Sequence, residues 1–543
     1  MPGARVGEPR LVVLGVADAT SSVPRTENGE HGMGKKLPAS FTNPTTLVGL
    51  VVAAISFIVI VFLVVLEYFE ATPNPYMGIL AFVLVPSVLL SGLAVAVFGV
   101  WREHRRQRMG LTSDRRMPVL DLNNPRHRAA VSLISLGTLA LILFSSFGSF
   151  KAYEHMESDR FCGQSCHVPM EPEYTAYSNS PHAKVGCVKC HIGSGADWFV
   201  RSKLSGSYQL YAVMLNKFPR PIKTPIRNLR PAQQTCEQCH WPKQFYSEKL
   251  VSHTYFTSGD THTRWKLDLL MKIGGGNVES GTASGIHWHM NIGNKVTYVT
   301  TDEARQTIPW VRSEGPKGTL TYRSTEVPLS AKDSAENPAR TMDCIDCHNR
   351  PAHNFRTPGR SVNLLMSLGR IDPSLPNAKD LAVFVLETPY SSSKAAADSI
   401  KIGIEEYYTS NFPALRTAKG KEIGQMVSEV QGIYSKNYFP AMGTSWKSFP
   451  DNIGHMYFLG CFRCHDGKHV AENGKVLSKD CNTCHAILAQ KFEHDTVRIS
   501  LKGVSYQHPV DVGNEWETSN CSDCHNPPAS KEKRVLGGQT ARK

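Results

Sequence analysis

One short pattern occurs seven times in the sequence: two cysteines followed at once by a histidine. All 14 cysteines of the 543-residue chain belong to these pairs. Six motifs have two residues between the cysteines, and the first motif, Cys162–His167, has three. The cysteines are Cys162 and Cys166, Cys187 and Cys190, Cys236 and Cys239, Cys344 and Cys347, Cys461 and Cys464, Cys481 and Cys484, and Cys521 and Cys524. The histidines that follow them are His167, His191, His240, His348, His465, His485 and His525.

The C-x-x-C-H pattern is the signature of covalent haem attachment. Two thiols three positions apart can form thioethers to the two vinyl groups of one porphyrin, and the adjacent imidazole then binds the iron. A zinc site or a redox dithiol uses such cysteine pairs as well, but neither requires a histidine directly after each pair. The motifs therefore predict seven covalently bound haem c groups. Because every cysteine is used, no disulfide is expected.

Three uncharged stretches near the N-terminus are each long enough to cross ~30 Å of hydrocarbon as a helix. They are Leu47–Leu66, Tyr76–Trp101 and Ala129–Phe150. A buried core helix usually carries a polar stripe, and these stretches have none. Residues 46–150 are therefore predicted to form a three-helix membrane anchor.

The distribution of arginines predicts the orientation of this anchor. Arg102–Arg128 contains eight arginines and three acidic residues, so it is expected on the cytoplasmic side. The Glu67–Pro75 loop has no Lys or Arg and suits the outer side. Polar residues 1–45 are expected to form a disordered cytoplasmic tail, with Met33 as an alternative native start. The N-terminus is thus predicted in the cytoplasm and the haem domain in the periplasm, on a bacterial inner membrane.

The chain after the anchor is expected to be a multihaem cytochrome c domain, mostly α with irregular loops and a small β portion. Its expected regions are 151–240 with motifs 1 to 3, a strand-containing insert at 241–340, and a tetrahaem region at 341–543 with a helical insert at 360–435. Strand patterns occur at 295–300 and 319–323, and helical patterns at Ala378–Glu387 and Ser392–Tyr408. The net charge of +13 raises nucleic acid as a partner. Haem propionates can neutralise this excess internally, so no nucleic acid is expected.

Second axial ligands must come from the histidines outside the motifs. Of the 21 histidines, seven are used in the motifs and three lie in the cytoplasmic part, which leaves eleven for seven irons. An iron with two axial ligands transfers electrons and offers no position to a substrate. We favour histidines near a motif and the alternating pair His287 and His289, which on a strand would face one side. The favoured ligands are His182, His287, His289, His353, His455, His469 and His508, and weaker candidates are His155, His253, His262 and His494.

The membrane segment followed by a first motif with a nearby methionine resembles the NapC/NirT (NrfH-like) family of membrane quinol dehydrogenases. Three spans with seven motifs are most similar to the heptahaem inner-membrane cytochromes of metal-reducing bacteria. In the family, the methionine of C-x-x-C-H-x-M can bind the iron in place of the histidine. Here Met170 follows His167 by three positions, so both remain candidates for the first iron.

The resemblance implies that menaquinol is oxidised at the first haem. Electrons would then pass to periplasmic cytochromes or terminal reductases in anaerobic respiration. The family places a lysine and an acid near the first haem, after the second motif. The matching candidates for the quinol site are Lys203 and Arg201, with Gln209 or Asp197 in place of the acid. Lys203 and Arg201 lie on a predicted amphipathic segment, Trp198–Leu215.

Two other functions stay open at this point. One is an electron carrier subunit without its own quinol site. The other is a multihaem nitrite or hydroxylamine reductase, which needs an iron with an open position and often has lysine in place of the motif histidine. No C-x-x-C-K occurs in the sequence, which disfavours the reductase.

Overall fold

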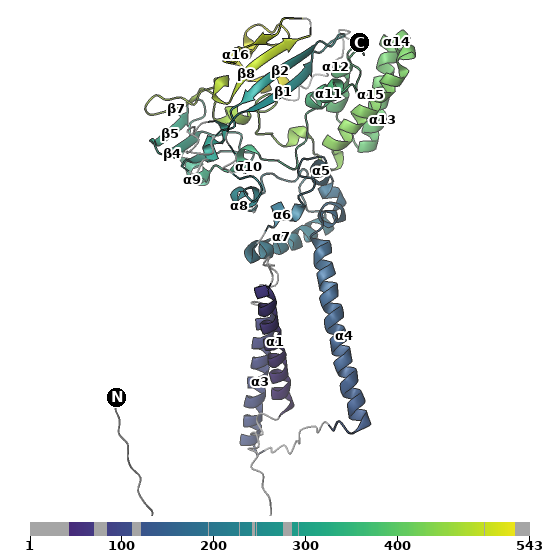
Figure 1. The fold of residues 1–543 in the computed structure, drawn as a ribbon, viewed down its shortest axis with the longest axis vertical. Helices are drawn as coiled ribbons and strands as arrows, with labels where there is room; N and C mark the ends of the chain where they lie inside the picture. Colours follow the sequence, from purple (N-terminus) through teal and green to yellow (C-terminus); the bar gives the residue numbers. More distant parts are fainter. Residues whose placement is uncertain are drawn as a thin grey trace, which may run out of the picture. The chain divides into compact units, whose positions relative to one another are not determined.

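A computed structural model of the chain describes residues 43–69, 84–110, 121–193, 195–226, 229–241, 245, 247–274, 285–290, 293–493 and 495–526. The chain divides into two compact units, residues 1–127 and 128–543, whose elements are drawn in Figure 1. The predicted tail lies outside the described residues except for 43–45. The alternative start at Met33 and most of the Glu67–Pro75 loop lie outside them as well.

The first unit is a close pair of apolar helices, α1 (Pro44–Phe69) and α3 (Val85–Arg108). Glycines bring the two backbones together, because a Cβ atom at Gly49 would meet the backbone of Gly92 and Ala96. Asn43 caps α1 by accepting the backbone N–H of Thr46 at 2.8 Å. Both helices are long and apolar enough to span a membrane.

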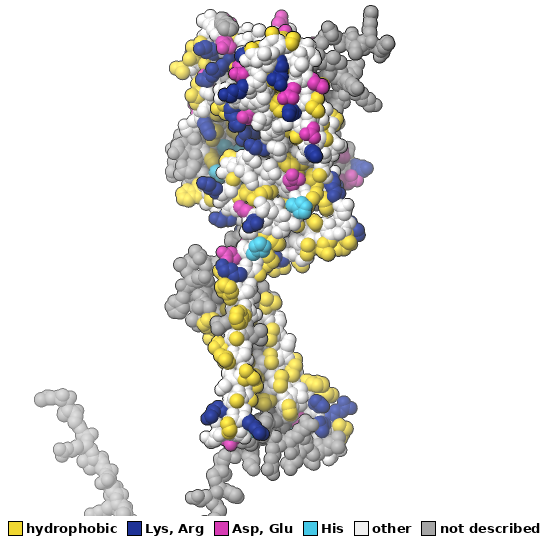
Figure 2. Space-filling view, turned by 90° about the vertical axis from the view of Figure 1, so that its right-hand side faces the viewer, with side chains coloured by type: hydrophobic (Ala, Val, Ile, Leu, Met, Phe, Trp, Pro, Cys, Tyr) yellow, Lys and Arg dark blue, Asp and Glu magenta, His cyan; other side chains and the backbone are white. Residues whose placement is uncertain are grey.

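The third apolar helix, α4 (Pro125–Met156), belongs to the second unit. Its Leu133, Ile134 and Leu136 are each about two-thirds exposed or more, as expected of side chains that face lipid. Figure 2 shows hydrophobic side chains spread over the helix surfaces. The prediction of three membrane spans is confirmed. The second helix continues through Arg102–Arg108 because arginine, glutamine and glutamate are good helix formers.

Two antiparallel sheets lie in the second unit. The first has the order β1 (Lys249–Phe256), β2 (Arg264–Met271), β8 (His485–Phe492), β9 (Arg498–Ile499). The second has the order β6 (Arg340–Thr341), β3 (Lys295–Val299), β4 (Trp310–Gly315), β5 (Gly318–Ser324), β7 (His469–Ala471). Residue pairs such as Met271 with His485 and Ser324 with His469 join distant parts of the chain. The sheets thus join the predicted insert at 241–340 to the predicted region 341–543.

A conventional hydrophobic core lies where the helical insert is predicted. Its helices are α11 (Pro358–Ser367), α12 (Ala378–Glu387), α13 (Ser393–Asn411), α14 (Pro413–Ala418) and α15 (Gly420–Asn437). Apolar residues at helical spacing, such as Ile400 and Ile404, are completely buried together with Met426. Each such side chain contributes roughly 1.5–3 kcal/mol on burial. Ser392 caps α13 by accepting the backbone N–H of Ala395 at 3.1 Å.

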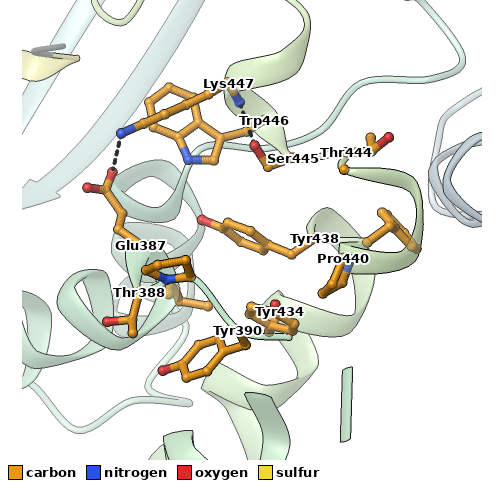
Figure 3. A pocket seen from close by; sticks show the side chains of 14 residues that line it. Glu387, Thr388, Tyr390, Tyr434, Tyr438, Pro440, Thr444, Ser445, Trp446 and Lys447 are labelled. Carbon is orange, nitrogen blue, oxygen red and sulfur yellow. Dashed lines mark hydrogen bonds and ion pairs between the residues drawn. The ribbon is translucent and has the colours of Figure 1, made fainter. Parts of the chain in front are cut away.

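A cavity of about 260 Å³ lies in this helical part (Figure 3). Tyr434 and Tyr438 stack there with ring centroids 4.8 Å apart, and Trp446 lies across from them. The ammonium of Lys447 lies 3.7 Å from the carboxylate of Glu387. The described lining of the cavity contains no cysteine or histidine, so the cavity is separate from the haem motifs.

The motifs themselves lie on short, one-turn helices, as expected of a domain in which haem supplies part of the core. These and the remaining short elements are η3 (Phe161–Ser165), α5 (His167–Ser178), α6 (Cys187–His191), α7 (Ala196–Met214), α8 (Ala232–Cys236), η6 (Ile286–Met290), α9 (Ala331–Glu336), α10 (Cys344–Cys347), η7 (Pro440–Met442), η8 (Trp446–Ser448), η9 (Gly460–Arg463), η10 (Cys481–Thr483), α16 (Glu515–Thr518) and α17 (Cys521–His525). None of the 14 cysteines is joined to another by a disulfide.

Candidate haem centres

Six of the seven motif histidines face a second imidazole from another part of the chain. The pairs, with the distance between ring centroids, are His191 with His353 (6.1 Å), His240 with His182 (6.1 Å), His348 with His287 (6.3 Å), His465 with His289 (5.9 Å), His485 with His455 (6.1 Å) and His525 with His508 (6.3 Å). Imidazole nitrogen binds a first-row metal at ~2 Å, so two axial rings on one iron have centroids about 6 Å apart. The two rings of each pair are therefore separated by the distance that binding one iron between them requires.

The hydrogen bonds of these rings fit the same purpose. A ligating imidazole binds metal through one nitrogen and donates from the other to a second-shell acceptor. The Nδ1 atoms of His287, His289 and His353 lie 3.2, 2.7 and 3.0 Å from the backbone carbonyls of Ile273, Ile286 and Glu173. This arrangement leaves each Nε2 for iron. His182, His455 and His485 each have a buried Nδ1 without a partner among the described residues.

Burial favours the neutral form of several of these imidazoles, which is the form that binds a metal. It lowers the pKa of His191 and His289. Burial, together with the neighbouring His485, lowers the pKa of His455 to about 4. The residues present thus fit a haem iron in charge as well as in spacing.

The alternating positions of His287 and His289 in the sequence predict a strand, but the structure has a different conformation there. Both lie on a 3₁₀ turn, η6, and not on a strand. Residues two apart on such a turn point ~240° apart, so the two rings cannot share one side. They face two different motif histidines instead.

The prediction that His469 is an iron ligand is not supported. Its Nδ1 lies 2.9 Å from a carboxylate oxygen of Asp466, and its Nε2 lies 2.7 Å from the carbonyl of Ile308. Both nitrogens are therefore used by the protein, and the buried ring fastens motif 5 to the second sheet. His262 is held in the same way, between the carbonyls of Thr257 and Leu375.

The other weaker candidates also have no motif histidine against them among the described ring contacts. His253 lies beside Tyr255, and His155 packs against Phe161. His494 lies outside the described residues.

The first motif is built differently from the other six. Its extra residue is taken up by a π turn, η3, which holds one more residue per turn than an α-helix. Gly163 is required there, because a Cβ atom would collide with the ring of Tyr174. The exposed His167 has no imidazole against it among the described ring contacts, and Met170 is half-buried one turn further on. Either side chain can still serve the first iron.

Lys203 on α7 lies beside this first motif. Its ammonium is close enough to the Cys162 sulfur to interact electrostatically, and it lies 4.8 Å from the centre of the Phe199 ring. The guanidinium of Arg201, by contrast, is exposed and paired with Asp197 at 3.1 Å.

Gln209 is not brought to Lys203. Its amide hydrogen-bonds to Ser205 at 3.3 Å and is exposed. Six residues along a helix correspond to a rotation of about 120°, so Gln209 lies on another face of α7. Helix α7 therefore does not bring these two quinol-site candidates together.

The acidic residue that sequence reasoning did not find is Asp159, between α4 and the first motif. It accepts the backbone N–H of Cys187 and the hydroxyl of Tyr177, both at 2.7 Å, and interacts with Cys162. Burial acts to raise the pKa of Asp159, but these hydrogen bonds outweigh it and lower the pKa. Burial and the bond to Asp159 raise the pKa of Tyr177 to about 12. Its place three residues before Cys162, beyond the third span, is the signal available in the sequence.

Helix α7 presents an apolar surface to its surroundings. Its exposed side chains include Leu204, Tyr208, Tyr211 and Met214, of which Leu204 and Met214 are 69% and 75% exposed. Figure 1 shows α7 running crosswise to α4. A helix that lies across a membrane span, with apolar residues uncovered, suits the surface of the bilayer.

Comparison with known proteins agrees with this arrangement. Residues 124–235 match the N-terminal region model of the NapC/NirT cytochrome c family. The chain is 41% identical over 493 residues to the cytochrome c-type protein ImcH of Geobacter sulfurreducens, covering 90% of this chain and 96% of that protein. No solved structure matches. The chain is thus a membrane-associated c-type cytochrome with covalently bound haem, and it belongs to the NapC/NirT cytochrome c family.

Proposed function

We propose that this protein is a membrane-bound heptahaem quinol dehydrogenase. It oxidises menaquinol at the outer surface of the bacterial inner membrane and passes the electrons to periplasmic cytochromes or terminal reductases in anaerobic respiration. Its N-terminus lies in the cytoplasm and its seven haem c groups lie in the periplasm. Each bound haem supplies an iron that takes up and releases one electron.

The six opposed imidazole pairs support a conduit over a reductase. An iron held by two axial histidines has no open position for nitrite or hydroxylamine. The histidines that would fill these positions come from outside the motifs and are partly buried, as His289 and His353 illustrate. The protein therefore carries electrons at these six centres and excludes small substrates from them.

The observation that carries the proposal is the first motif. Cys162 follows the end of α4 at Met156 by only six residues. Its histidine has no opposing imidazole among the described ring contacts, and Lys203 lies within electrostatic range of Cys162. The chain thus combines a membrane span, a haem site unlike the others and a cation at one location.

This combination suits quinol chemistry. Oxidation of a quinol releases two electrons and two protons, so the ring oxygens must lose protons near the acceptor. The Lys203 ammonium favours the deprotonated quinol because opposite charges attract strongly where water is partly excluded. The uncovered apolar residues of α7 would hold the helix at the bilayer surface, where the quinol ring arrives. Arg201, paired with Asp197, is suited to lipid headgroups.

The test is haem reduction by a quinol in proteoliposomes of the holoprotein. A short-chain menaquinol analogue should reduce the haems rapidly enough to support turnover. The absorbance of the haems gives the rate of reduction. If dithionite reduces the haems and the quinol does not, the protein is a carrier subunit without its own quinol site. If the reduced protein turns over nitrite or hydroxylamine, the reductase is supported instead.

A further inference from the structure

We infer that the seven haem sites form one row in the order of their motifs, and that the turn Ile286–Met290 joins its first four members to its last three. The row begins at motif 1 beside α4 and ends at motif 7. Its direction of electron flow rests on the proposed function, while the order itself rests on contacts between cysteines and between histidines.

Three contacts between thiols pair neighbouring motifs. Cys162 lies close to Cys187, Cys236 to Cys344, and Cys461 to Cys484. These contacts join motifs 1 and 2, 3 and 4, and 5 and 6. Hydrogen bonds join the same regions, because Asp159 accepts the backbone N–H of Cys187 at 2.7 Å and Asp343 accepts that of Ala232 at 3.0 Å. Each sulfur carries the edge of a porphyrin once the thioether has formed. Two sulfurs in contact therefore bring the two porphyrin edges together.

The pairs are linked to one another in the same order. Cys190 lies within electrostatic range of Cys236, which links motif 2 to motif 3. Cys347 and Cys464 link motifs 4 and 5 in this way. Cys481 and Cys521 link motifs 6 and 7. All of these contacts between described cysteines join motifs that are consecutive in the sequence, so the sites follow one another in a row.

Two histidines fasten the first half of the row across the sequence. His353 follows motif 4, but it faces His191 of motif 2. His182 precedes motif 2, but it faces His240 of motif 3. His182 therefore comes from a segment next to one haem site and serves the next site, whereas His353 comes from beside motif 4 and serves motif 2, two places away in the row.

The junction between motifs 4 and 5 is a single 3₁₀ turn. His287 faces His348 of motif 4, and two residues later His289 faces His465 of motif 5. The ring of His287 stacks on Phe245 at 4.5 Å. Both ligands are thus held by five residues of backbone, which fixes two neighbouring irons relative to each other.

The two ligand pairs of this turn have distinguishable signatures. The imidazole planes of His287 and His348 are 5° apart, whereas those of His289 and His465 are 88° apart. Parallel axial imidazoles give ferric haem a rhombic low-spin EPR spectrum, and perpendicular ones give the most anisotropic spectrum. The haem sites of motifs 4 and 5 can therefore be told apart without any quinol.

The first experiment is EPR of the oxidised holoprotein with His287→Ala and His289→Ala. His289→Ala should remove the most anisotropic low-spin signal and create one high-spin haem. His287→Ala should leave that signal and remove a rhombic one. Added imidazole should restore each low-spin signal, which shows that the variant is folded. If both variants alter the same signal, or neither creates high-spin iron, the assignment of the turn to two haem sites is overturned.

The second experiment tests the order. If the haem sites form a row, a change at motif 5 slows electron transfer to the two sites beyond it. Quinol-driven reduction of the last two haems should slow at least ~10-fold in His289→Ala, about 1.4 kcal/mol on the barrier. The haems of motifs 1 to 4 should keep the wild-type rate, and dithionite should reduce all seven. The matched variant His508→Ala, at the end of the row, should leave the haems of motifs 1 to 6 unaffected.

The outcomes separate the order from the function. The single row is overturned if His289→Ala and His508→Ala slow the reduction of the same number of haems. It is also overturned if His289→Ala slows the reduction of none. If quinol reduces no haem in the wild-type protein, the proposed function fails. The EPR assignment of the turn stands or falls independently of that result.

Discussion

The carboxylate of Asp159 accepts the backbone N–H of Cys187 at 2.7 Å. This bond ties the segment that follows the third span to the second haem motif. The other carboxylate oxygen accepts the hydroxyl of Tyr177, also at 2.7 Å. A single side chain therefore connects the end of α4, helix α5 and motif 2, and so fixes where the haem domain begins.

Replacing Asp159 with Ala should destabilise the second unit by about 3 kcal/mol or more, because two hydrogen bonds to a charged group are lost and each contributes about 1.5–3 kcal/mol. The matched variant Tyr177→Phe keeps the bond to Cys187 and should lose about half as much. Thermal unfolding of the two holoproteins, followed by circular dichroism, measures the difference. Equal midpoints for Asp159→Ala and the wild type would contradict this role.

The same carboxylate should make stability depend on pH. The pKa of Asp159 lies below its ordinary value because its hydrogen bonds outweigh the effect of burial. Such a group contributes stability above its unfolded pKa of ~3.9 and loses it as the pH falls through the lower folded pKa. The difference in melting temperature between the wild type and Asp159→Asn should thus be constant at neutral pH and shrink below pH ~4. A difference that grows on acidification would reverse the assignment.

Replacing Lys203 with Met should lower the rate of quinol-driven haem reduction at least ~10-fold, or ~1.4 kcal/mol on the barrier. Dithionite should still reduce every haem. Lys217→Met is a matched control, because Lys217 also lies over an aromatic ring, that of Tyr211, at 5.2 Å. Stopped-flow absorbance in proteoliposomes gives both rates. An unchanged rate in Lys203→Met removes this residue from the quinol site.

Replacing His353 with Ala should convert one low-spin iron to high-spin, since His353 faces the motif histidine His191. Intact mass should show that all covalent haem is retained, because the cysteines of motif 2 are untouched. His469→Ala is the control, since both ring nitrogens of His469 are bonded to protein groups. It should lower the melting temperature and leave the haem spectra unaltered. A new high-spin signal in His469→Ala would restore it as a ligand.

Reporter fusions should locate the two sides of the membrane. A fusion after Gly110 should be active only in the cytoplasm, and a fusion after Glu157 only outside. The arginines of Arg102–Arg128 drive this orientation, because positively charged loops stay on the cytoplasmic side. An external signal after Gly110 would mean that the number or the direction of the spans is different.

The sequence predicted the features that depend on neighbouring residues. The three spans follow from uninterrupted apolar stretches, and helix α12 has the predicted bounds Ala378–Glu387. The strand patterns at 295–300 and 319–323 correspond to β3 and β5, and the amphipathic segment corresponds to α7. Motif spacing, periodicity and composition are properties of short windows. Local sequence therefore determines them almost completely.

The partners of the motif histidines depend on contacts that no window contains. His182 and His240 are 58 positions apart in the sequence, and His287 meets His348 across 61 positions. His469 resembles a ligand in its spacing, yet the chain folds the carbonyl of Ile308 onto its free nitrogen. The two sheets join 249–271 with 485–499 and 295–324 with 469–471. This pairing brings distant segments of the chain, and the histidines on them, close together. The sequence alone thus contains seven haem-attachment motifs and predicted a membrane anchor. Only tertiary packing decided which imidazole faces which site, because that choice depends on long-range pairing of backbone and side chains.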